Sequence, residues 1–167
     1  VTVAGIVASV TSSMTRRGRM MRVVLDDRSA TEELAVFSEA YEQHRHLLKE
    51  DELVIVHGKV SKDEYSGGYR FGAERILDLG TARGESARAL KLRMNGESSA
   101  ARLRTVLGPF KIDGSQGAGC PVEIEYHNGS AAVSMRLGPD WVVKPEDALL
   151  AQLKDWLSAD GVQLVYR

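Results

Sequence analysis

The order of strand-like and helix-like segments in the first 79 residues leaves few folds open to them. Five segments carry the apolar, β-branched or alternating patterns typical of strands: 1–10, 20–25, 33–37, 53–58 and 69–77. The first of these is apolar enough throughout to predict a strand buried on both faces. Between the third and the fourth, residues 38–49 change to a helical period, with Ser38 as the expected N-cap. Five-stranded oligonucleotide-binding (OB) barrels have this order of three strands, one helix and two strands. We therefore expect residues 1–79 to form an all-β OB barrel with one helix.

A basic cluster, Arg16, Arg17 and Arg19, lies between the first two strand patterns. An unpaired charge is costly to bury, so these guanidinium groups predict an exposed hairpin tip. Arginine binds phosphate oxygens with a planar fork of donors. In OB barrels the ligand lies across strands two and three, flanked by the loop between strands one and two and the loop between strands four and five. We predict that the cluster contacts phosphates; the alternative is a solvated tip that only keeps the hairpin soluble.

The loop at residues 61–68 would flank the same groove. Its candidates for nucleic-acid contact are two cations and two tyrosines: Lys62, Arg70, Tyr65 and Tyr69. An exposed aromatic ring contributes about 1–3 kcal/mol for each base that stacks on it. Core packing stays open for the tyrosines, and plain solvation for the cations. Phe37 and Phe71 are expected in the core, because phenylalanine is usually buried.

The remainder of the chain predicts a second, mixed α+β domain. Residues 80–89 are polar and contain glycines, which indicates a linker or a weak helix. The following segments have the order strand, helix, two strands, helix, strand: 90–94, 98–107, 122–126, 131–137, 145–157 and 162–166. The Asn128-Gly129 pair indicates a hairpin turn, and Pro145 is expected at the first position of the second helix. This order is typical of a small split βαβ (ferredoxin-like) domain, which we place at residues 90–167.

The residue types exclude several kinds of site. Cys120 is the only cysteine, so an internal disulfide framework and a cysteine-rich zinc site are excluded. Asp26 and Asp27 are adjacent at a strand end and point in opposite directions, which favours capping of the turn over metal binding. No Ser/His/Asp set, phosphate-binding loop or dinucleotide fingerprint is present. We therefore expect no metal, no cofactor and no catalysis by this chain itself.

The net charge of −1 gives no global basic field, so any nucleic-acid binding must come from a local basic face. No apolar run reaches membrane-spanning length and no signal peptide opens the chain, which favours a cytoplasmic protein without membrane contact. The chain begins Val-Thr-Val, without an initiator methionine. That suggests a piece of a longer polypeptide, although processing would look the same.

Several motifs, in this order, resemble those of one family. Besides the arginine-glycine tip they are Leu25-Asp26-Asp27-Arg28-Ser29, Val60-Ser61, Ser66-Gly67-Gly68, Arg136-Leu137-Gly138-Pro139-Asp140-Trp141 and Asp147-Ala148-Leu149-Leu150. Together they resemble the C-terminal region of the bacterial replicative DNA polymerase III alpha subunit, over essentially the whole chain. The resemblance implies an OB barrel that contacts single-stranded template DNA and a terminal domain that binds the tau subunit of the clamp loader. In that family the polymerase carboxylates lie upstream, so a DNA-directed DNA polymerase is implied for the parent chain and not for this part of it.

The resemblance also implies a partner surface in the second domain. Trp141 and Trp156 are its aromatic candidates, with core packing as the alternative for both. Gln163, Leu164 and Tyr166 loosely resemble the glutamine-led peptide that binds the sliding clamp, and an edge strand is the alternative there.

Two other functions are open to the sequence. One is an RNA-binding OB module appended to a tRNA-charging or RNA-processing enzyme. The other is a barrel that binds only protein, since a fold does not fix a function. A tRNA-charging enzyme would continue into a nucleotide-binding catalytic core, and the second domain predicted here has a different pattern.

Overall fold

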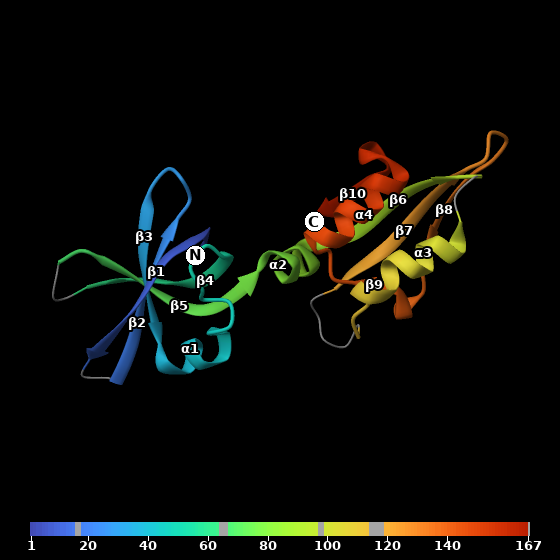
Figure 1. Ribbon diagram of the computed structural model, residues 1–167. Helices are drawn as coiled ribbons and strands as arrows, with labels where there is room; N and C mark the ends of the chain where they lie inside the picture. The colour runs from blue at the N-terminus through green and yellow to red at the C-terminus, as the bar shows by residue number, and fades with distance from the viewer. Residues whose placement is uncertain (16–17, 64–66, 97–98, 114–118, 167) are drawn as a thin grey trace. The chain divides into compact units, whose positions relative to one another are not determined.

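The computed structural model describes residues 1–15, 18–63, 67–96, 99–113 and 119–166. The chain divides into two compact units, Val1–Leu79 and Gly80–Arg167, which we call the barrel domain and the sheet domain (Figure 1). No helix in the described part of the chain is long and apolar enough to cross a membrane.

The barrel domain is a closed five-stranded barrel with the neighbour order β1-β2-β3-β5-β4. Its elements are β1 (Thr2–Thr15), β2 (Gly18–Asp26), β3 (Thr31–Phe37), α1 (Ser38–His44), β4 (Leu53–Lys62) and β5 (Tyr69–Asp78). Paired strands are antiparallel except β3 and β5, which are parallel. The predicted OB barrel and its order of elements are confirmed.

The barrel strands alternate between an inward and an outward face, and this produces the period of two in their sequences. Val7, Val23, Leu34 and Val56 are fully buried in the interior. Ile6, in contrast, is 36% exposed. The prediction that the first strand is buried on both faces was wrong, because a small closed barrel has one interior and the outward side chains of β1 meet solvent.

The pairing of β4 with β5 is irregular at Gly58. The register between β4 and β5 shifts between His57 and Gly58. A Cβ atom on Gly58 would collide with the carbonyl oxygen of Gly72 and lie 2.6 Å from the ring of Phe71. Glycine is therefore required for this close approach of two strands. Phe71 itself is 3% exposed, as predicted for a core aromatic residue.

Helix α1 is shorter than predicted and begins differently. It ends at His44 instead of Lys49, and Phe37, without a side-chain bond, occupies the N-cap position expected for Ser38. The Ser38 hydroxyl donates instead to the carbonyl oxygen of Arg19, at 2.6 Å. This bond ties the start of the helix to β2.

Two carboxylates close the turn between β2 and β3. The Asp27 Oδ1 atom accepts hydrogen bonds from the Ser29 hydroxyl at 2.7 Å and from the amides of Ser29 and Ala30 at 2.9 and 3.0 Å. Asp26 accepts one from the amide of Arg28 at 2.7 Å. The Ser29 hydroxyl, followed by the two amides, lowers the pKa of Asp27 to about 2. The predicted capping role of these carboxylates is confirmed.

The sheet domain has the predicted order of strands and helices, with one short strand added. Its elements are α2 (Leu79–Ser86), β6 (Ala87–Asn95), α3 (Ala100–Leu107), η1 (Gly108–Phe110), β7 (Cys120–His127), β8 (Ala132–Arg136), η3 (Pro139–Trp141), β9 (Val142–Val143), α4 (Asp147–Leu157), η4 (Ala159–Gly161) and β10 (Val162–Tyr166). Of the two alternatives predicted for residues 80–89, a linker or a weak helix, the structure shows the helix, α2, followed by the first residues of β6.

The strand order in this sheet differs from the predicted split arrangement. It is β10-β6-β7-β8, with β9 paired to β7. In a split βαβ unit another strand separates the two parallel strands, whereas β6 and β7 pair directly and in parallel here. The split, ferredoxin-like topology is therefore not the one observed. Pairing partners depend on long-range packing, which the order of elements alone does not specify.

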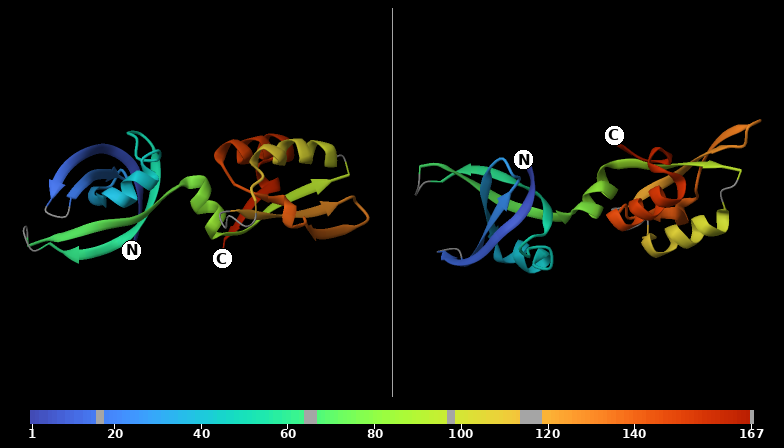
Figure 2. Two further views of the ribbon diagram at one scale, coloured as in Figure 1. Left: turned by 90° about the horizontal axis from the view of Figure 1, so that it is seen from below. Right: turned by 45° about the horizontal axis from the view of Figure 1, so that its top comes forward.

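Helices α3 and α4 lie on the same face of the sheet (Figures 1 and 2). Leu103 and Leu107 of α3 and Leu149 and Leu153 of α4 are buried in one cluster with the inward side chains of β6 and β7. Helix α4 begins at Asp147 with Glu146 as its N-cap, so the prediction of Pro145 at the first helical position was wrong.

Candidate nucleic-acid interface

The β1–β2 hairpin extends well beyond the barrel core. Its pairing continues to Thr15 opposite Gly18. Near the tip Met14 is 83% exposed, and Arg19 is exposed and donates from Nε to the Ser12 hydroxyl at 3.1 Å. Two of the three predicted phosphate ligands, Arg16 and Arg17, lie outside the described residues.

The β4–β5 hairpin carries the second set of predicted contacts. Its pairing continues to Lys62 opposite Tyr69, and both are exposed, Tyr69 by 83%. Arg70 is engaged within the hairpin, because its Nη2 atom lies 3.1 Å from Oδ1 of Asp63. Tyr65 lies outside the described residues. Of the residues predicted to bind nucleic acid in this hairpin, Lys62 and Tyr69 are therefore exposed and accessible to a ligand.

The two hairpins project from the same side of the barrel domain (Figures 1 and 2). The fold thus brings Arg19 of one hairpin to the side that also carries Lys62 and Tyr69 of the other. A single strand that crosses this side would meet cations for its phosphates and an exposed ring for a base.

Phe37 adds an aromatic surface that the sequence reasoning missed. It was expected in the core but is 36% exposed. It pairs with Met20, the residue after Arg19, at the end of β3 where the chain leaves the barrel wall for α1. The signal in the sequence was its position, immediately before the helical period begins. A strand's last residue lies at the rim of a barrel, where one side of its ring faces solvent.

Ion pairs distinguish Arg19 and Lys62 from three other cations of the barrel domain. Three cations each lie beside a carboxylate: Arg22 with Glu33 at 3.1 Å, Lys59 with Glu74 at 2.6 Å and Arg70 with Asp63 at 3.1 Å. The hydrogen bond to Glu74 also raises the pKa of Lys59. Within the described part of the chain, no carboxylate forms an ion pair with Arg19 or Lys62. Their charges are thus left for an anionic ligand.

In the sheet domain, both tryptophans pack on the core. Trp141 and Trp156 are half-buried against the cluster of buried side chains. Lys111 Nζ lies 4.5 Å from the centroid of the Trp141 ring, and the Arg102 guanidinium lies 5.1 Å from that of Trp156. Each ring packs on the core with one side, stays partly exposed, and has a cation stacked on it. Their part in a partner surface stays a prediction.

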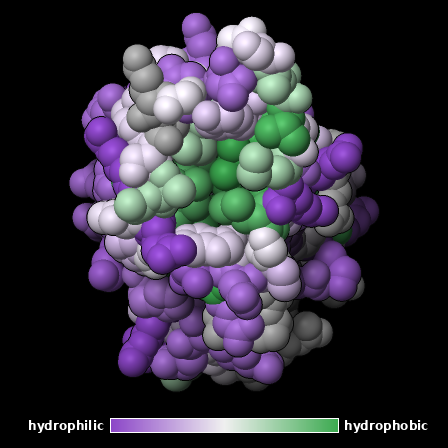
Figure 3. Space-filling model, turned by 90° about the vertical axis from the view of Figure 1, so that its right-hand side faces the viewer, coloured by the Kyte–Doolittle hydropathy of each residue, from purple (hydrophilic) through white to green (hydrophobic). Residues whose placement is uncertain are grey.

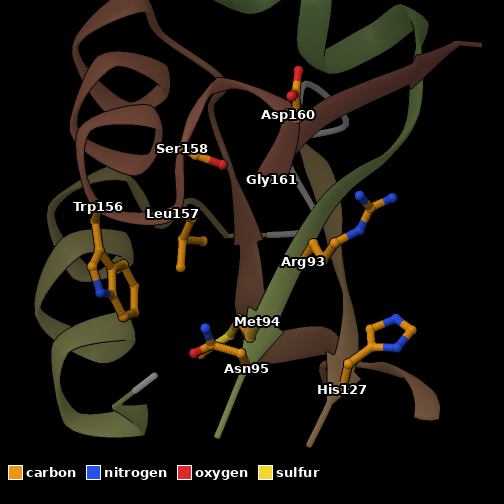
Figure 4. A pocket seen from close by; sticks show the side chains of 9 residues that line it. All are labelled: Arg93, Met94, Asn95, His127, Trp156, Leu157, Ser158, Asp160 and Gly161. Carbon is orange, nitrogen blue, oxygen red and sulfur yellow. The ribbon is translucent and has the colours of Figure 1, made fainter. Parts of the chain in front are cut away.

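Trp156 also lines an open pocket of about 570 Å³. Its walls come from the ends of β6, β7 and α4 and from η4 (Figure 4): Arg93, Met94, Asn95, His127, Trp156, Leu157, Ser158, Asp160 and Gly161. The lining carries charges of both signs, so it selects neither an anion nor a cation.

The last residues of the described chain form strand β10 at one edge of the sheet. Gln163 and Tyr166 are exposed, Leu164 is half-buried against the core, and all three pair with β6. This is the edge strand that was the alternative to a clamp-binding peptide. Binding of these residues by a clamp would require β10 to leave the sheet.

Comparison with known proteins finds a matching family model for each of the two domains. Residues 1–79 match the family model of an OB-fold nucleic acid binding domain, and residues 102–157 match the C-terminal domain of DNA polymerase III subunit alpha. The DNA polymerase III alpha subunits of Pseudomonas aeruginosa and Vibrio cholerae are each 34% identical over 99% of this chain. The chain spans about 14% of the length of these relatives. Among solved structures, RecG bound to a three-way DNA junction matches at a TM-score of 0.38 and 27% identity, over 46% of this chain and 11% of that one.

The two family matches follow each other in the same order as the two domains of the structure. The resemblance that the motifs indicated is thus confirmed over nearly the whole chain. This chain belongs with the C-terminal region of the bacterial DNA polymerase III alpha subunit.

Proposed function

We propose that this chain is the non-catalytic C-terminal part of a replicative DNA polymerase, which holds single-stranded template DNA and tethers the polymerase to the tau subunit of the clamp loader. The observation that carries the first half is the pair of hairpins on one side of an OB barrel, in which no carboxylate of the described residues pairs with Arg19 or Lys62 and Tyr69 and Phe37 are exposed. The second half rests on the homology of the sheet domain.

The barrel acts through backbone charge and stacking, without reading the sequence of the template. Each phosphate contact on a single strand changes the slope of log K against log salt by about −0.7, so three arginines give a slope of about −2. Such a module alone binds at roughly tens of micromolar, or about −6 kcal/mol. It is effective because a polymerase already bound to DNA raises its local concentration to roughly millimolar.

A titration of the full chain distinguishes this function from RNA binding. Fluorescence anisotropy is measured with labelled single-stranded DNA, duplex DNA and single-stranded RNA at two salt concentrations. We expect single-stranded DNA to bind more tightly than duplex, and the triple change Arg16→Ala, Arg17→Ala and Arg19→Ala to weaken it at least fivefold and to flatten the salt dependence.

The matched control removes positive charge elsewhere in the same domain. Arg45, next to α1, lies 3.7 Å from Glu42 and 67% of its side chain is exposed. The variant Arg45→Ala is expected to leave the affinity for single-stranded DNA unchanged. Equal loss in both variants, or tighter binding of RNA than of DNA, refutes the template role.

A further inference from the structure

Strand β8 leaves part of the sheet domain's apolar face uncovered. In the ladder with β7, Met135 lies opposite Ile124 and Val133 lies opposite Tyr126. Directly paired residues share a face of the sheet, and Ile124 is buried beneath the helices. Val133 and Met135 therefore point to the helix side, yet they are 49% and 42% exposed.

The two helices α3 and α4 are too few to cover all four strands β10, β6, β7 and β8, and the face of β8 stays open. Helix α4 contacts β10 and β6, and α3 packs beside α4. Every residue of β8 is exposed. We call Val133, Met135 and the half-buried Tyr126 the β8 strip. Figure 3, which views the molecule from the right-hand side of Figure 1, shows a hydrophobic area among hydrophilic side chains on that side.

The helix that borders the strip carries positive charge only. Residues 99–111, which include α3, contain Arg102, Arg104 and Lys111 and no aspartate or glutamate. Arg102 and Lys111 stack on Trp156 and Trp141. Arg104 follows Arg102 by two residues, which is about 200° around the helix axis, so it lies on the side of α3 away from α4. It is exposed, and because α4 contacts β10 and β6, we place it on the side of α3 that faces the strip.

We infer that the β8 strip is the docking surface for an acidic, amphipathic helix of the partner protein. The helix lies beside α3 in the place of a third helix of the layer, with its apolar residues on Val133, Met135 and Tyr126 and its carboxylates toward Arg104. Strand β8 has five residues and is about 17 Å long, which matches about three turns of helix. This inference rests on the proposed tether and names the face of the sheet domain that the tether uses.

The test uses the full chain and the purified tau subunit as the probe. We expect Val133→Glu and Met135→Glu to weaken binding at least tenfold, because each buries a carboxylate in the interface. The matched control is Val60→Glu, since Val60 of the barrel domain is also 49% exposed. It is expected to bind tau as the wild-type chain does. Arg104→Glu, which changes only an exposed charge, is expected to weaken binding and Arg104→Lys to retain it.

The outcomes separate the two proposals. If the wild-type chain binds tau and Val133→Glu binds as well as Val60→Glu, the strip is refuted and the tether stands. If the wild-type chain does not bind tau, the tether is refuted and this inference with it. Amide hydrogen exchange of the complex tests whether the partner docks as a helix. An added strand would pair with the free edge of β8 and strongly protect the β8 amides that do not bond to β7. Such protection would contradict the docked helix.

Discussion

At the scale of single residues, Asp27 stabilises the turn between β2 and β3 of the barrel. Its carboxylate accepts three hydrogen bonds, and its pKa of about 2 lies below its ordinary value of 3.8. A carboxyl group whose pKa is lower in the folded state stabilises that state above its unfolded pKa. The stabilisation is lost as the pH falls through the folded value.

We predict that Asp27→Ala lowers the thermal midpoint of the barrel domain at pH 7, and that the difference from the wild-type chain shrinks as the pH falls from about 4 to about 2. Calorimetry over this pH range measures it. The control is Glu32→Ala, an exposed carboxylate of β3. A difference that stays constant with pH would contradict the role of the Asp27 charge.

At the scale of elements, the sequence predicts what local periodicity encodes and misses what distant contacts decide. The barrel order follows from runs with a period of two and turn residues between them. The end of β1 was missed because residues 11–15 are polar except for Met14 and still pair with β2 in a hairpin that projects from the barrel. The direct pairing of β6 with β7 was missed because it depends on how helix α3 returns the chain to the sheet. Phe37 was misplaced because its burial depends on the position of the barrel rim.

At the scale of elements, we predict that the pairing of β4 with β5 depends on glycine at position 58. A methyl group there meets the Gly72 carbonyl and the Phe71 ring across the β4–β5 ladder, so Gly58→Ala is expected to destabilise the barrel domain by about 1–3 kcal/mol. The matched control is Gly72→Ala, where the nearest atom to a new Cβ is 3.7 Å away. Urea unfolding followed by circular dichroism measures both variants. Equal stability of the two would contradict the close approach of the strands.

At the scale of the whole molecule, the two domains have separate cores. The buried clusters share no residue, one lying within Val1–Leu79 and the other within Gly80–Arg167. Both tryptophans belong to the sheet domain, so their fluorescence reports on that domain alone.

We predict that Leu153→Ala lowers the free energy of unfolding of the sheet domain by about 2–5 kcal/mol, because Leu153 is fully buried. The affinity of the barrel for single-stranded DNA should stay within twofold of the wild-type value. Tryptophan fluorescence in urea and the anisotropy titration measure the two quantities. Loss of DNA binding while the barrel remains folded would show that the two functions are coupled.

The most direct test of the central claim is a map of where a single strand of DNA touches the barrel. The amide resonances of the isotopically labelled full chain are followed while a short single-stranded oligonucleotide is added. We predict shifts concentrated at Arg19, Lys62, Tyr69 and Phe37, with the second half of helix α1 and the sheet domain unaffected. Shifts confined to other surfaces, or none at millimolar oligonucleotide, would contradict the assignment of this side of the barrel to template DNA.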